Sequence, residues 1–184
     1  MYDGISKLSV ATLAILASTN LAAPAKPRSS AISGAAVFEN VCLADGPILD
    51  HLEDLAKASR WKPLAEDLVV AFTLSENAAA AKGWIIADDP FVAVASSMNI
   101  VAGRAVEACT VAAANQDVSL FEKQIVAKTV ATLEDTVQSE RTILKRYSAP
   151  DGPEKQELTL TLPINLMGKG AVTASITRNQ RMEN

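Results

Sequence analysis

Residues 157–163 read ELTLTLP and residues 171–178 read AVTASITR, and in both stretches apolar and polar side chains alternate. Successive side chains of a β-strand point to opposite faces of the sheet, so this period of two indicates two strands with one buried and one wet face. The apolar set comprises Leu158, Leu160, Leu162, Val172, Ala174 and Ile176. The polar set, a possible binding surface or plain solvent-facing strand, comprises Thr159, Thr161, Thr173, Ser175 and Thr177.

Upstream of these strands the patterns change between helical and extended. Further strands are expected at about 84–87, 91–98 and 104–113, and apolar residues at helical spacing indicate a long helix from about 118 to 138. Two helices are expected near the N-terminus, at 34–44 and 47–61, whereas 63–82 could be helix or strand, with helix favoured. The fold expected is α+β: an antiparallel β-sheet of about five to six strands packed on one face by the long helix and the N-terminal helices.

The first 25 residues have the order of a secretory signal peptide. Lys7 is followed by an apolar run over 8–17 and by Ala23-Pro24-Ala25, with cleavage expected after Ala25. The alternatives are a packed helix and a membrane anchor, but ten apolar residues reach only about 15 Å as a helix, half of a bilayer core. No membrane span is therefore expected. The domain organisation expected is a signal peptide at 1–25, a flexible lead at 26–33, a single α+β domain at 34–178 and a frayed tail at 179–184.

The chain has two cysteines, Cys42 and Cys109. They could form a disulfide, two buried thiols, a metal clip, or a nucleophile with its partner. Export to an oxidising compartment favours the disulfide. A zinc site is disfavoured because the two cysteines lack the C-x-x-C spacing. A cysteine nucleophile is disfavoured because the chain has only one histidine that could act as its base.

That histidine, His51, lies in the densest acidic group of the chain. Asp50, His51 and Asp54 are candidates for a metal or acid–base site, because Asp54 follows the histidine by three positions and shares its helix face. The alternative is a solvated helix face, in which Glu53 pairs with Lys57 one turn on. No G-x-S-x-G motif presents a nucleophilic serine. No catalytic residue and no cofactor is assigned.

A net charge of −4 and the lack of a basic cluster do not support nucleic-acid binding. The function expected is that of an exported, periplasmic or secreted, non-catalytic small domain that binds an unknown envelope protein or small ligand. One alternative is a hydrolase or metal-dependent enzyme centred on Asp50, His51 and Asp54. Another is a periplasmic inhibitor or chaperone that acts through the Thr/Ser face of the sheet.

Overall fold

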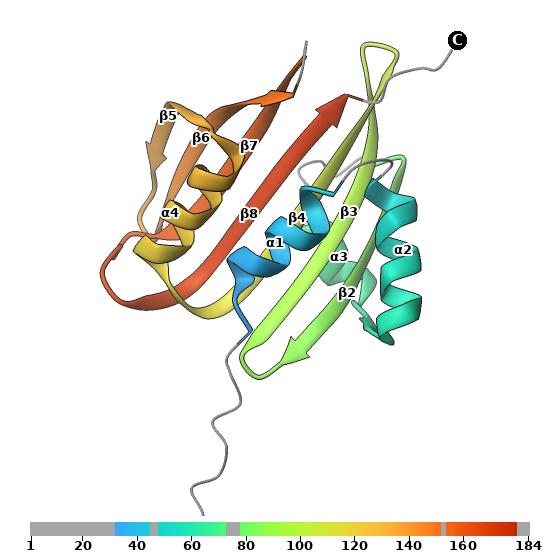
Figure 1. Cartoon of the computed structure of the whole chain (residues 1–184), viewed down its shortest axis with the longest axis horizontal. Coiled ribbons are helices and arrows are strands. Elements are labelled where there is room, and N and C mark those ends of the chain that lie inside the picture. Colours follow the sequence, from blue (N-terminus) through green and yellow to red (C-terminus); the bar gives the residue numbers. More distant parts are fainter. Residues whose placement is uncertain (1–31, 45–47, 73–77, 152–153, 180–184) are drawn as a thin grey trace, which may run out of the picture. The chain divides into compact units, whose positions relative to one another are not determined.

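The computed structural model describes residues 32–44, 48–72, 78–151 and 154–179, and the predicted signal peptide and most of the flexible lead lie outside this range. The described residues form four helices and eight strands (Figure 1). In chain order these are α1 Gly34–Cys42, α2 Ile48–Ser59, β1 Lys62–Pro63, α3 Glu66–Phe72, β2 Ala80–Asp88, β3 Phe91–Val101, β4 Arg104–Asp117, α4 Val118–Thr129, β5 Thr132–Gln138, β6 Thr142–Asp151, β7 Glu154–Pro163 and β8 Lys169–Asn179.

Within the described ranges, the eight strands make one antiparallel sheet in the order β1-β2-β3-β4-β8-β7-β6-β5. The α+β class is thereby confirmed, whereas the expected count of five to six strands is wrong. After β4 the chain passes through α4 to β5 at one edge of the sheet, and β6, β7 and β8 then lead back to the centre. The pairing of β4 with β8 therefore joins the first half of the sheet to the second.

The alternating stretches form β7 and β8, as predicted. Leu158 lies opposite Ile176, Leu160 lies opposite Ala174, and all four side chains are fully buried. Each such leucine stabilises the fold by roughly 1.5–3 kcal/mol relative to an exposed one. The period of two therefore places the main core on one face of the sheet.

Helices lie on both faces of the sheet, not on one as expected. α1 and α4 lie in front of the sheet in Figure 1. Phe38 of α1, Leu52 of α2 and Ile125 of α4 share one core with the leucines of β7. The short α3 lies behind the sheet in this view, where Val69 packs on Ala93 of β3 in a separate small cluster. Because neighbouring residues of a strand face opposite ways, Ala93 belongs to the back face while Val92 and Val94 belong to the main core.

The prediction of one long helix over 118–138 is correct for 118–129 and wrong for the residues after Thr129. α4 ends at Thr129, and Val130 adopts the left-handed conformation at φ 50° and donates its N–H to the carbonyl of Val126. Residues 132–138 then form β5, which pairs with β6 and is exposed along its whole length. Leu133 and Val137 continue the helical spacing of α4, but the backbone pairing with β6 overrides that local pattern.

The ambiguous segment 63–82 contains both kinds of element. It holds α3, and β2 begins at Ala80, while 73–77 lie outside the described residues. The strands expected at 84–87, 91–98 and 104–113 exist as β2, β3 and β4, each longer than expected. Gly83 lies inside β2, and a Cβ there would be 3.1 Å from side-chain atoms of Leu64 and Val69. The glycine thus gives the α3 segment room to pack on β2.

The disulfide between Cys42 and Cys109 is confirmed. Their Cα atoms are 5.4 Å apart, and both residues are fully buried. Cys42 is the last residue of α1 and Cys109 lies in the middle of β4. The bridge therefore fixes the C-terminal end of α1 to the centre of the sheet.

Candidate functional site

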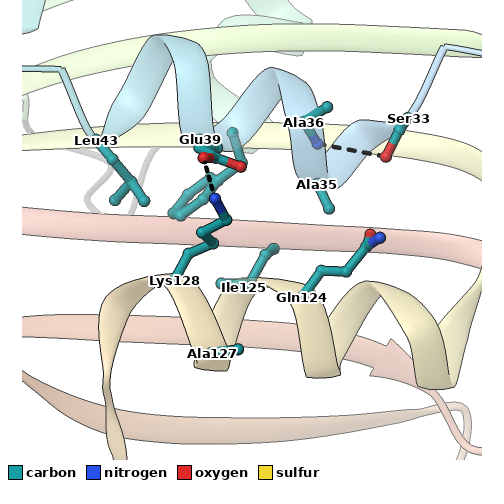
Figure 2. A pocket seen from close by; sticks show the side chains of 10 residues that line it. Ser33, Ala35, Ala36, Glu39, Leu43, Gln124, Ile125, Ala127 and Lys128 are labelled. Carbon is teal, nitrogen blue, oxygen red and sulfur yellow. Dashed lines mark hydrogen bonds and ion pairs between the residues drawn. The ribbon is translucent and has the colours of Figure 1, made fainter.

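A hollow of about 250 Å³ lies between α1 and α4, on the face of the sheet that carries the main core (Figure 2). Ile125 points from α4 towards α1, and the fully buried Phe38 contributes to the lining from α1. The residues that line this α1–α4 hollow are Ser33, Ala35, Ala36, Phe38, Glu39, Leu43, Gln124, Ile125, Ala127 and Lys128. Apolar side chains dominate this set, which is the composition typical of small-molecule sites.

Small residues on the facing helices leave this space open. Ala35 and Ala36 on α1 and Ala127 on α4 end at Cβ, so the two helices approach without filling the volume between them. Ala36 and Ala127 are also exposed, which makes the hollow accessible from solvent. The sequence shows these small residues, but they indicate a hollow only once the structure shows that α1 and α4 face each other.

One ion pair spans the mouth of the α1–α4 hollow. Lys128 Nζ lies 2.6 Å from Glu39 Oε1, and the two side chains are 57% and 41% exposed (Figure 2). At this exposure the pair stabilises the fold by at most about 1 kcal/mol. Its two charges compensate each other, so the ion pair links α1 to α4 and leaves no net charge at this end of the hollow.

The start of α1 is positioned by hydrogen bonds from both near and far in the sequence. Ser33 Oγ accepts from the N–H of Ala36 at 3.3 Å, as an N-cap. Gln116, at the end of β4, accepts from the N–H of Gly34 at 2.9 Å and donates to the carbonyl of Ala114 at 3.0 Å. Together with the disulfide at the other end of the helix, these contacts hold α1 at both ends.

A second polar cluster links α4 to the sheet but does not line the α1–α4 hollow. Tyr147 Oη and Lys145 Nζ both donate to Glu122 Oε1, each at 2.6 Å. Burial, and then the hydrogen bond to Glu122 and its negative charge, raise the pKa of the Tyr147 hydroxyl well above its ordinary value near 10. The single carboxylate of Glu122 therefore accepts hydrogen bonds from both the buried phenol of Tyr147 and the largely buried ammonium of Lys145.

This cluster predicts a pH dependence of stability. Because the folded state raises the tyrosine pKa, the unfolded chain loses the proton first, and stability falls as pH rises above about 10. Tyr147→Phe should cost about 1–2 kcal/mol near neutral pH, since it removes a hydrogen bond to a charged group. Its deficit relative to wild type should shrink between about pH 9 and pH 11, measured by urea unfolding. A deficit that stays constant over this range contradicts the assignment.

The predicted acid–base residues lie on α2, away from the α1–α4 hollow. Asp50 and Asp54 are exposed and His51 is half-buried. Lys57 Nζ is 3.9 Å from Asp54 Oδ1 and 3.3 Å from Glu53 Oε1, as expected for a solvated helix face. A hydrogen bond from Lys82, followed by contacts with Lys57, lowers the pKa of the Glu53 carboxyl. The described ranges hold no group of three or more His, Cys, Asp or Glu side chains that could bind a metal ion, and the role of these residues stays a prediction.

The Thr/Ser residues of β7 and β8 lie on the face opposite α1 and α4, as the alternation requires. Thr159 pairs with Ser175 across the strands, and both are buried, while the other three, Thr161, Thr173 and Thr177, are half-buried. Ser175 Oγ is 2.9 Å from the hydroxyl oxygen of Thr110, so part of this row already has a partner within the sheet. The proposal that the row binds another molecule stays a prediction.

In the part of the chain that the structure describes, no helix is long and apolar enough to cross a membrane. Comparisons with protein-family models, with curated proteins and with solved structures found no match to this chain.

Proposed function

We propose that the protein is an exported, non-catalytic domain that binds a small, largely apolar ligand in the α1–α4 hollow. The observation that carries the proposal is an accessible space of about 250 Å³ with apolar walls, placed between two helices that are each fixed to the sheet. A preformed apolar site of this kind avoids the ordering cost of building one on binding.

The buried disulfide supports an oxidising compartment for this function, because thiols are kept reduced in the cytosol. With the signal-peptide pattern of residues 1–25, this favours the periplasm or the extracellular space. Expression of the full chain in a Gram-negative host, followed by fractionation and intact-mass analysis, tests this part. The expected mass is that of a chain cleaved after Ala25 with both sulfurs oxidised. A cytoplasmic, uncleaved chain contradicts export.

Binding in the hollow is testable with N-phenylnaphthylamine, a neutral dye that fluoresces in apolar surroundings. The dye should bind with one site per chain. Ala36→Phe should weaken this binding at least about tenfold, because the ring occupies the hollow from an exposed helix position. Asn40→Phe is the matched control: it adds the same ring on an exposed position of α1 that does not line the hollow.

Comparing the two variants distinguishes a blocked binding site from a destabilised fold. Both place a phenylalanine on an exposed position of α1, but only position 36 lines the hollow. Circular dichroism and urea unfolding should show both folded, with small and similar losses of stability. Equal dye binding by wild type and Ala36→Phe, or equal loss in both variants, overturns the assignment of the hollow as the binding site.

A further inference from the structure

A second hollow of about 220 Å³ adjoins the first at the N-terminal end of α4. It is lined by Ile32, Ser33, Asn115, Gln116, Asp117, Leu120, Phe121, Gln124 and Lys169, and we call it the Lys169 hollow. Ser33 and Gln124 line both hollows, so the two spaces meet at these side chains. Along α4 the lining runs from Leu120 to Lys128, about 12 Å at the rise of an α-helix. We call the two adjacent hollows together the groove.

The charges along this groove are unequally compensated. At the far end, Glu39 and Lys128 neutralise each other. In the Lys169 hollow, Asp117 caps α4 by accepting from the N–H of Leu120 at 2.9 Å. Lys169 lies opposite Asp117 in the strand pairing, yet among the described residues it has no ion-pair partner within 4.0 Å. Asp117 adds a carboxylate to the same hollow, and the partial positive charge at the N-terminal end of α4 offsets part of its negative charge. Lys169 is therefore the cation of the groove that has no ion-pair partner in the described part of the chain.

The polar side chains in the middle of the groove are Ser33 and Gln124, and Gln116 lies in the Lys169 hollow. Ser33 Oγ is engaged with the N–H of Ala36, and Gln116 is engaged at both ends of its amide. The exposed, apolar Leu120 and Ile32 border the Lys169 hollow. The groove therefore joins the apolar α1–α4 hollow to an end that carries the Lys169 ammonium beside the Asp117 carboxylate that caps α4.

We propose that the ligand is a medium-chain amphipathic carboxylate, with its chain in the α1–α4 hollow and its carboxylate on Lys169. This inference rests on the proposed function, because it names the ligand class of the same site. An apolar chain is stabilised by transfer from water onto Phe38 and Ile125. The carboxylate gains a charge-assisted hydrogen bond from the lysine. A cationic head group meets Lys169 with the same sign of charge and is disfavoured.

The test is displacement of N-phenylnaphthylamine from the full chain by three probes of equal length: octanoate, octanol and octylammonium. Octanoate should displace the dye at about five- to tenfold lower concentration than octanol, which lacks the charge. Octylammonium should be weaker than octanol. Equal potency of octanoate and octanol, or a stronger octylammonium, overturns the proposal. Dye binding without any advantage for octanoate leaves the proposed function intact, whereas absence of dye binding contradicts the function itself.

Variants locate the head group. Lys169→Gln should remove the advantage of octanoate over octanol and leave the affinity for octanol unchanged. Lys169→Arg retains the charge and should retain the preference. Lys123→Gln is the matched control, an exposed lysine on α4 that lines neither hollow. A preference for octanoate that survives Lys169→Gln, or that falls equally in Lys123→Gln, places the carboxylate elsewhere and overturns the proposal.

Discussion

Replacing both cysteines by alanine is expected to lower the free energy of unfolding by about 4 kcal/mol. The bridge joins residues 67 positions apart, and closing a loop of this length removes that much entropy from the unfolded chain. Domains of this size are typically stable by only about 5–15 kcal/mol, so the loss is a large fraction of the total. Alanine is preferred to serine here because both sites are fully buried, and a buried hydroxyl would add a separate penalty. Urea unfolding without reductant measures the effect.

Single variants distinguish the crosslink from packing. Cys42→Ala and Cys109→Ala each break the same bridge, so each should lose nearly as much stability as the double variant. If the two single losses instead add up to the double loss, the sulfurs act as independent packing groups, and the entropic explanation is wrong. The double variant should also bind N-phenylnaphthylamine more weakly, because α1 then keeps only its N-terminal attachment to β4.

Gly34→Ala is the second large effect, and its expected sign is opposite to helix propensity. Alanine is favoured over glycine inside a helix by about 1 kcal/mol. At position 34, however, a Cβ would lie 2.6 Å from the Cβ of Ala113 and 3.3 Å from a ring carbon of Phe121. α1 would have to move off β4, at a cost of roughly 1–3 kcal/mol. We therefore expect net destabilisation in urea unfolding, together with weaker dye binding, because α1 forms one wall of the hollow.

A compensating change tests this contact directly. Ala113→Gly removes the opposing Cβ. The double variant Gly34→Ala/Ala113→Gly should therefore lose less stability than the sum of the losses of the two single variants. Asn40→Ala controls for helix propensity, since it makes a comparable change on an exposed position of α1. A stabilising effect of Gly34→Ala, or strict additivity in the double-mutant cycle, contradicts the close approach of α1 to β4.

The site was only partly accessible to sequence reasoning. Cys42 and Cys109 could be paired because their number and their expected compartment left few alternatives. The lining residues carry no comparable signal: Glu39 and Lys128 are an ordinary acid and an ordinary base, 89 positions apart by their numbers (128 − 39), until α1 and α4 are placed together. Gln116, which holds the start of α1, is equally inconspicuous in the sequence. His51 is the sole imidazole of the chain, but composition alone does not place a residue in a cavity.

The sequence by itself determined the features that depend on near neighbours. The period of two at 157–163 and 171–178 identified β7 and β8 and their buried faces, and helical spacing identified α1 and α2. Tertiary structure decided the elements whose local pattern fits two conformations. Residues 132–138 have helical spacing yet form β5, because their backbone pairs with β6. The groove was likewise decided only in three dimensions, since its walls come from two helices that long-range contacts bring together, and local patterns do not encode such contacts.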